Sequence, residues 1–204
     1  MKHKLIFYLF FSVASLITGC QVSKDPMRMQ IRSLQKGVIK EDTSYAYSLP
    51  YEINTSHLLV QGYFSKYSHR NRAALDFKMK RGTRICAARN GVVSRIKEDG
   101  KKGGPNKKYR SEGNFIVIKH GDGSFAGYWH LQQNGVLVNV GNTVKQGQVV
   151  GLSGKTGYAL FPHLHFSVWQ NNASEQKQQT ATRFITSKGI IYLRPFRKYR
   201  NIHP

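Results

Sequence analysis

The stretch YALFPHLHFSVW, residues 158–169, has the alternation of a β-strand with two chemically different faces. Residues two apart in a strand point to the same side of a sheet, so His163 and His165 would share one face. Imidazole ligates zinc and titrates near neutrality, so two imidazoles on one rigid strand suit a metal site or a proton-transfer site. Two surface histidines on a half-exposed strand are the alternative that this pair alone leaves open. The expected apolar face is Leu164, Phe166 and Val168, and Ser167 and Trp169 join the histidines.

The rest of the chain predicts a mainly β domain built from antiparallel strands. Short strand-like runs alternate with turns rich in Gly, Asn, Asp and Lys, and no run has a long apolar pattern at the helical period. Residues 97–113 and 170–180 are predicted as polar loops. The predicted strands are 57–63, 75–79, 84–88, 91–96, 114–119 and 125–130, followed by a final pair, 181–187 and 189–196, around Lys188.

The first nineteen residues have the layout of a secretory signal peptide. Two lysines precede an almost wholly apolar run, which is too short to cross a membrane as a helix. The sequence LITGC, residues 16–20, resembles the bacterial lipobox, which makes Cys20 the predicted lipidation site; an ordinary signal peptide is the alternative. Gln21 favours an outer membrane, on its periplasmic side, if the cell has two membranes. The expected organisation is a signal peptide at 1–19, an irregular tether at 20–50 and a folded domain at 51–204, with core motifs at 61–169 and a strand pair and basic tail at 181–204.

Positive charge is the strongest bias in the composition. The chain has 32 Lys and Arg against 10 Asp and Glu, a formal net charge of +22. Such a charge predicts a polyanionic partner. Behind a signal peptide that partner is expected in the bacterial cell envelope, as anionic lipid, lipopolysaccharide, teichoic acid or peptidoglycan carboxylates, and not as nucleic acid. The basic clusters are expected to govern association with the wall from positions away from the metal: Lys101, Lys102, Lys107, Lys108, Arg110, Arg194, Arg197, Lys198 and Arg200.

Two further segments supply side chains that can join the histidine pair. His69 and Asp76 lie around the start of one predicted strand, and His130 ends an aromatic run, YWH at 128–130. Zinc hydrolases use three protein ligands and leave the fourth tetrahedral position open. His69, Asp76 and His165 would make such a two-His, one-Asp site. Bound zinc lowers the pKa of water toward about 7, and His130 and His163 would then serve proton and charge chemistry.

Together these motifs resemble the lysostaphin/LytM-type zinc endopeptidases of bacterial cell walls. The matching motifs stand in the family's order: ALDF (74–77), GT (82–83), AARNGVV (87–93), GYWHL (127–131), GKTG (154–157) and PHLHF (162–166). The resemblance implies an antiparallel, β-sandwich-like domain with a groove-shaped site that holds one zinc ion. It implies His69, Asp76 and His165 as the zinc ligands, and His130 and His163 as the catalytic histidines.

The first ligand is the point at which the chain departs from the family's usual spacing. The family's first His often lies four residues before the Asp, whereas His69 lies seven before Asp76. His57, nineteen residues before Asp76, is the rival. His69 is favoured because it lies nearer the predicted strand. The remaining histidines of the mature chain, His120 and His203, are expected to face solvent.

The expected function is that of a lipid-anchored, zinc-dependent endopeptidase that hydrolyses peptide bonds in peptidoglycan stems or cross-links. The alternative is a non-catalytic LytM-type lipoprotein that binds and activates a cell-wall amidase. Such activators typically lose metal-site residues, whereas this chain keeps a candidate at every position. The enzyme is therefore the favoured expectation.

Overall fold

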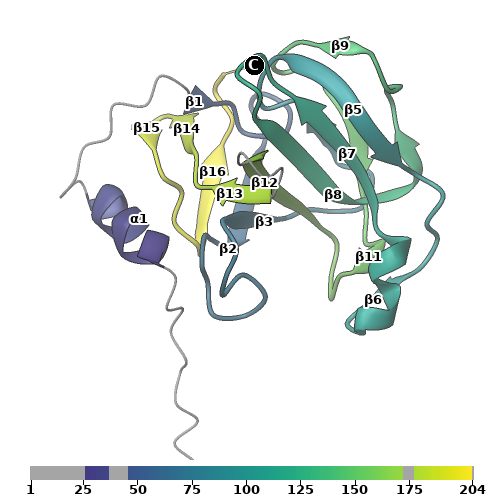
Figure 1. Cartoon of the computed structure of the whole chain (residues 1–204), viewed down its shortest axis with the longest axis horizontal. Helices are drawn as coiled ribbons and strands as arrows, with labels where there is room; N and C mark the ends of the chain where they lie inside the picture. Colours follow the sequence, from purple (N-terminus) through teal and green to yellow (C-terminus); the bar gives the residue numbers. More distant parts are fainter. Residues whose placement is uncertain (1–25, 37–45, 172–176, 204) are drawn as a thin grey trace, which may run out of the picture.

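Antiparallel strands dominate this computed structural model, which describes residues 26–36, 46–171 and 177–203 (Figure 1). The largest sheet contains β2 (Ser56–Gln61), β3 (Ala74–Lys78), β4 (Arg84–Cys86), β5 (Gly91–Lys97), β7 (Asn114–Lys119), β8 (Phe125–Val136), β9 (Thr143–Val144), β10 (Val149–Ser153), β12 (His163–Asn171), β13 (Lys177–Thr180) and β16 (Arg197–Arg200). Its main path runs β16-β2-β3-β12-β8-β7-β5-β9, with β10 on β4 and β8 and β13 on β12. Every pairing in this sheet is antiparallel. The prediction of a mainly antiparallel β domain is confirmed.

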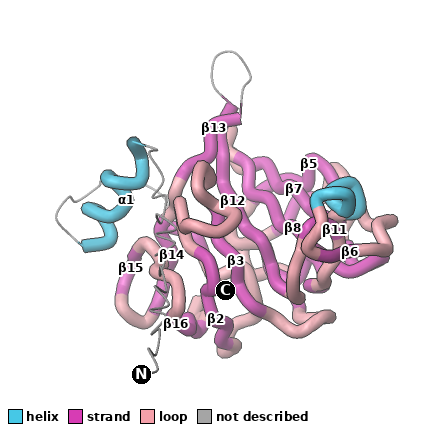
Figure 2. The backbone as a smooth tube through the Cα atoms, turned by 90° about the horizontal axis from the view of Figure 1, so that it is seen from below, coloured by secondary structure: helices cyan, strands magenta, loops and turns pink. Residues whose placement is uncertain are grey.

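Two smaller sheets flank the large one. The first joins β1 (Ala46–Tyr47), β14 (Arg183–Thr186) and β15 (Gly189–Ile191), and the β14–β15 hairpin is the predicted strand pair around Lys188. The second pairs β6 (Gly103–Gly104) with β11 (Gly157–Tyr158) beside a 3-10 helix, η1 (Lys107–Glu112). Figure 2 shows this group at one side of the molecule. The loop predictions are therefore wrong in part, because 97–113 contains β6 and η1, and β12 and β13 form a hairpin that takes in both ends of 170–180.

The hydrophobic core lies on the inner face of the large sheet, where the alternation of β12 places it. Leu164, Phe166 and Val168 are all part of the core, as the sequence predicts. Phe166 makes edge-on ring contacts with Tyr128 and Phe184, at 5.2 and 5.9 Å between centroids. Burial of each such side chain stabilises the fold by about 1.5–3 kcal/mol. One face of β12 is therefore held against the core, which leaves its other face free for chemistry.

The helix α1 (Pro26–Lys36) corrects the expectation of an irregular tether. Ile31 is buried against Phe64 and Ala73, and Gln35 Nε2 donates a hydrogen bond to the carbonyl oxygen of Leu193 at 3.0 Å. The sequence does carry a helical period here, since Met27, Ile31 and Leu34 stand four and three residues apart, but the run is short and the residues it packs against lie more than thirty positions away. The helix lies beside the segment that joins β2 to β3.

The folded domain begins before the predicted boundary at residue 51. Tyr47 and Leu49 are part of the hydrophobic core, so the chain enters the domain at β1. Among the described residues, no helix is long and apolar enough to cross a membrane. The predicted signal peptide at 1–19 and the lipidation site Cys20 lie outside the described residues.

Candidate metal centre and catalytic groove

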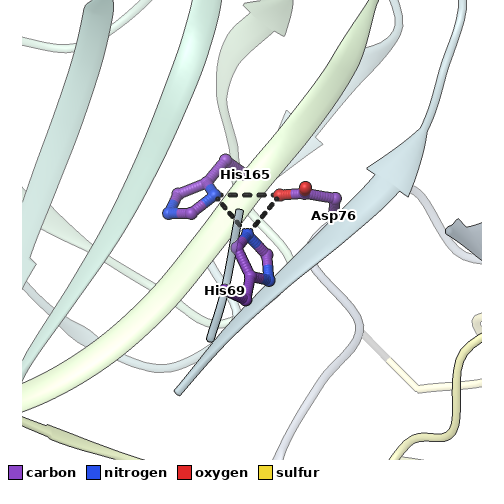
Figure 3. Close-up of side chains that lie close together, drawn as sticks. All are labelled: His69, Asp76 and His165. Atoms are coloured by element: carbon purple, nitrogen blue, oxygen red, sulfur yellow. Dashed lines mark hydrogen bonds and ion pairs between the residues drawn. The ribbon is translucent and has the colours of Figure 1, made fainter. Parts of the chain in front are cut away.

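Three side chains predicted as ligands meet on the outer face of β3 and β12 (Figure 3). Asp76 on β3 and His165 on β12 are direct partners across the strand pair, so their side chains emerge side by side. His69 arrives from the segment that joins β2 to β3. His165 Nδ1 lies 2.8 Å from Asp76 Oδ1, and His69 Nε2 lies 3.2 Å from the same oxygen. His69 Nε2 and His165 Nδ1 are 3.3 Å apart.

This donor set fits a metal ion of the size of zinc. Tetrahedral zinc with bonds of about 2.0–2.1 Å to nitrogen and oxygen has ligand atoms separated by about 3.3 Å. The three observed separations, 2.8, 3.2 and 3.3 Å, are close to that edge. His69 and Asp76 are almost fully buried, so their positions are held by packing and not by solvent-exposed rotamers. The cluster can hold a metal ion with three protein ligands.

The surroundings of Asp76 and His165 keep both groups in the protonation states that a metal needs. Burial alone would raise the pKa of Asp76, but hydrogen bonds from His165 and His69 outweigh it and hold that pKa well below its usual value. Burial lowers the pKa of His165 to about 4, although Asp76 opposes the shift. The cluster therefore offers a carboxylate and a neutral imidazole at neutral pH.

Gln61 is a site residue that the sequence did not single out. Its Nε2 donates a hydrogen bond of 2.7 Å to Asp76 Oδ2, the oxygen that faces away from the two histidines. Its Oε1 accepts hydrogen bonds of 3.1 Å each from Ser65 Oγ and from the backbone N–H of Ser68. Gln61 thus ties one ligand to the segment that delivers His69. No local motif marks it, because its contact with Asp76 spans fifteen residues.

His130 owes its direction to a β-bulge. Asn114 pairs with Leu131 and Phe115 pairs with Trp129, so His130 is an extra residue in β8. Its φ is +67°, a left-handed conformation that a side chain rarely adopts. Such a conformation costs on the order of 1 kcal/mol, and bulges near active sites commonly re-aim a side chain. Here the bulge brings His130 to within 4.6 Å of His163, measured between ring centroids.

Backbone carbonyls set the tautomers of the two predicted catalytic histidines. His130 Nδ1 lies 2.7 Å from the carbonyl oxygen of Thr156, and His163 Nδ1 lies 2.8 Å from that of Phe161. A carbonyl only accepts, so both Nδ1 atoms carry the proton and both Nε2 atoms keep a lone pair. His163 Nε2 is 3.8 Å from Asp76 Oδ1. Burial, with His163 and His165 nearby, lowers the pKa of His130 to about 3.

The other histidines of the described chain lie away from this cluster. His57 does not approach Asp76 or His165; its ring packs edge-on against Tyr51 at 4.6 Å, so the structure brings His69 to the cluster and not the rival. His120 was expected to face solvent and does not. It is buried, with Nδ1 at 2.7 Å from the carbonyl oxygen of Asn90.

A groove runs past the cluster, and Trp129 forms part of its wall. The Trp129 ring meets His165 edge-on at 5.4 Å between centroids. Gly127 makes room for this ring, because a Cβ at residue 127 would lie 1.9 Å from a Trp129 ring carbon. Asp76, His130, His163 and His165 line the groove, whereas His69 joins the cluster without lining the groove.

The comparison with known families rests on the same stretch of chain. The model of peptidase family M23 matches residues 70–177, more than half of the 204-residue chain. The chain belongs to peptidase family M23. The match begins one residue after His69, so this M23 domain draws one member of its cluster from just outside the matched range.

The relatives of this M23 domain include cell-wall peptidases. Peptidoglycan DD-endopeptidase ShyA of Vibrio cholerae is 38% identical over 93 residues, which cover 46% of this chain and 19% of that protein. Glycyl-glycine endopeptidase ALE-1 of Staphylococcus capitis is 36% identical over 119 residues, 58% of this chain and 30% of that protein. The chain thus spans less than a third of each. The deep-sea M23 metalloprotease pseudoalterin shares the fold, with a TM-score of 0.50 at 18% identity over 79% of this chain and 98% of that one.

Proposed function

We propose that this chain is a zinc-dependent endopeptidase that hydrolyses peptide bonds in bacterial peptidoglycan. One observation carries the proposal: three ligand atoms with the spacing of a zinc site lie beside two histidines whose Nε2 lone pairs are free. The substrate class is supported by the M23 relatives, whose names describe endopeptidases of peptidoglycan and of glycyl-glycine bonds. The activity of this chain is itself a proposal, because the relatives are much longer proteins and the match covers only part of each.

The proposed roles follow from the positions of the atoms. His69 Nε2, Asp76 Oδ1 and His165 Nδ1 hold the metal. Zinc, when bound, supplies a Lewis acid for the substrate carbonyl and lowers the pKa of water. One of the two Nε2 atoms, that of His163 or that of His130, accepts the single proton that the attacking water loses, since both Nδ1 protons are engaged with backbone carbonyls. Once protonated, either imidazolium stabilises the developing negative charge or returns the proton to the departing amine.

The test is cleavage of isolated peptidoglycan by the purified protein, with and without a chelator. We expect soluble fragments with new amino termini, loss of activity with the chelator and recovery with zinc. His130→Ala and His163→Ala should keep about one zinc per chain and lose most activity, whereas Asp76→Ala and His165→Ala should lose the zinc. Failure of the zinc-loaded protein to release any fragment would contradict the proposal. Stimulation of an added cell-wall amidase by that same inactive protein would then support the activator.

We also propose that the mature chain is lipid-anchored at Cys20 in the bacterial cell envelope, on the periplasmic face of an outer membrane if there are two membranes. The LITGC sequence at 16–20 supports this. Cys20→Ser should abolish labelling by a fatty-acid analogue and release the protein from membranes. Labelling of the Cys20→Ser protein would contradict the anchor and leave the proposed hydrolysis untouched.

A further inference from the structure

The charged side chains that line the groove are mostly positive. In the part of the chain that the structure describes, five basic side chains lie along it and Asp76 is the one acidic side chain. Asp76 is already engaged by His165, His69 and Gln61. A concave surface with low-dielectric walls concentrates the field of such charges. The basic residues that line it are Arg72, Lys78, Lys107, Arg110 and Lys177.

None of these five cations forms an ion pair with a carboxylate in the described parts of the chain. Basic residues elsewhere do have such partners. Arg84 pairs with Glu52 at 3.0 Å, and Arg89 pairs with Asp122 at 2.8 Å. Among the described residues, Asp76 is the only carboxylate that lines the groove. The groove therefore keeps an uncompensated positive field in the described structure.

Lys177 on β13 stands directly over the aromatic wall beside the metal centre. Its Nζ lies 3.7 Å from the centroid of the Trp169 ring and 5.2 Å from that of Trp129. Trp129 in turn contacts His165. Burial against these rings, together with the charges of Arg95 and Arg72, lowers the pKa of Lys177 to about 8. A bound anion would relieve this repulsion, so the position of Lys177 suits one.

A second pair of cations, Lys107 and Arg110, is held on η1. The amide side chain of Asn106 caps the start of this 3-10 helix by accepting from the backbone N–H of Lys108. Arg110 lies over the ring of Tyr158, at 5.6 Å from its centroid, and Tyr158 also lines the groove. Figures 1 and 2 both show η1, beside β6 and β11, well apart from β13. The cations are thus positioned at separate places along the groove.

This arrangement corrects one expectation from the sequence. Lys107 and Arg110 belong to the basic clusters that were expected to act away from the metal, yet both line the groove that contains it. The tail residues Arg197, Lys198 and Arg200 do lie outside the groove lining. The positive charge of the chain is therefore divided between the substrate groove and the remote surface.

We propose that the groove selects an anionic peptide, one whose free carboxylates pair with Lys177 and Arg72 on one side of the metal centre and with Lys107 and Arg110 near η1. The inference rests on the proposed function and deepens it: the substrate is a stem peptide with its side carboxylates free, in preference to the same peptide with those groups amidated. A carboxylate held by a lysine or arginine gains charge-assisted hydrogen bonds that a carboxamide does not.

The test compares two forms of one soluble, cross-linked stem peptide, with its side carboxylates free or converted to carboxamides. Cleavage is followed on the zinc-loaded wild type, and binding is followed by fluorescence anisotropy on the zinc-loaded His163→Ala protein. We expect the free form to bind and to be cleaved about tenfold better or more, with the difference shrinking as salt rises. Equal binding of the two forms would overturn the inference. Preferential binding without cleavage of either form would overturn the proposed hydrolysis and keep the inference.

Matched variants locate the effect in the groove. In Lys177→Gln and Arg110→Gln the preference for the free form over the amidated form should fall severalfold. Lys188→Gln and Lys198→Gln, which remove exposed charges outside the groove, should leave the preference unchanged. An equal fall in the preference in these two controls would assign the effect to net charge and contradict a groove subsite.

Discussion

Removal of the Gln61 amide should weaken zinc binding without disturbing the fold. Gln61 Nε2 donates a hydrogen bond of 2.7 Å to a charged oxygen of Asp76. Its Oε1 accepts hydrogen bonds from Ser65 and Ser68 in the segment that leads to His69. A hydrogen bond to a charged group contributes about 1.5–3 kcal/mol, and loss of a partner behind a ligand typically costs 10–100-fold in metal affinity. Gln61→Leu keeps nearly the same volume and loses both contacts. We expect its zinc dissociation constant to rise by about 10–100-fold.

The assay is a competition titration of the metal-free protein with zinc and a chromophoric chelator. Gln178→Leu is the matched control, because Gln178 also lines the groove and is not a partner in the hydrogen bonds that the structure describes for His69, Asp76 and His165. Activity of Gln61→Leu should recover largely at saturating zinc, since Gln61 positions a ligand and touches no reacting atom. A Gln61→Leu affinity within about twofold of wild type, or an equal loss in Gln178→Leu, would refute the reasoning.

Three further predictions follow from the site and its surroundings. In metal-free protein the pKa of His165 is about 4 and that of His130 is about 3, and both lie below the unfolded value of about 6.5. Acid therefore protonates these histidines in the unfolded chain first, and the folded state loses stability as the pH falls below 6.5. At pH 5 the loss should be about 2 kcal/mol per histidine, seen as a lower melting temperature, and a melting temperature equal at pH 7 and pH 5 would contradict it. Gly127→Ala should displace the Trp129 ring, cost about 1–3 kcal/mol and change the tryptophan fluorescence, whereas Gly121→Ala, with nothing within 4 Å of its added Cβ, should do neither. Neutralising Arg197, Lys198 and Arg200 together should weaken salt-dependent binding to peptidoglycan sacculi and leave the cleavage of a soluble peptide unchanged. Slower cleavage of the soluble peptide would contradict this, because it would mean that the tail takes part in substrate handling at the metal site.

Much of the fold follows from local patterns. The alternation of residues 163–169 correctly separates the core face of β12 from the face that carries the histidines, because every second side chain of a strand shares one environment. The predicted strands at 57–63, 75–79, 84–88, 91–96 and 114–119 agree with β2, β3, β4, β5 and β7 to within a few residues at each end. The helix α1 was not predicted, although Met27, Ile31 and Leu34 recur at helical spacing. So short an amphipathic run depends on tertiary contacts, here those of Ile31 with Phe64 and Ala73.

The sequence by itself determined which residue types are available to the site and in which order. The His-x-His pair and the Asp motif carry that information, since a strand position sets a side chain's face. Tertiary structure alone decided that His69 and not His57 meets Asp76, that a bulge turns His130 toward His163, and that Gln61 stands behind the ligand. It also decided which of the many basic residues line the groove. These outcomes depend on strand register and on contacts between distant segments, and neither is encoded in the spacing of neighbouring residues.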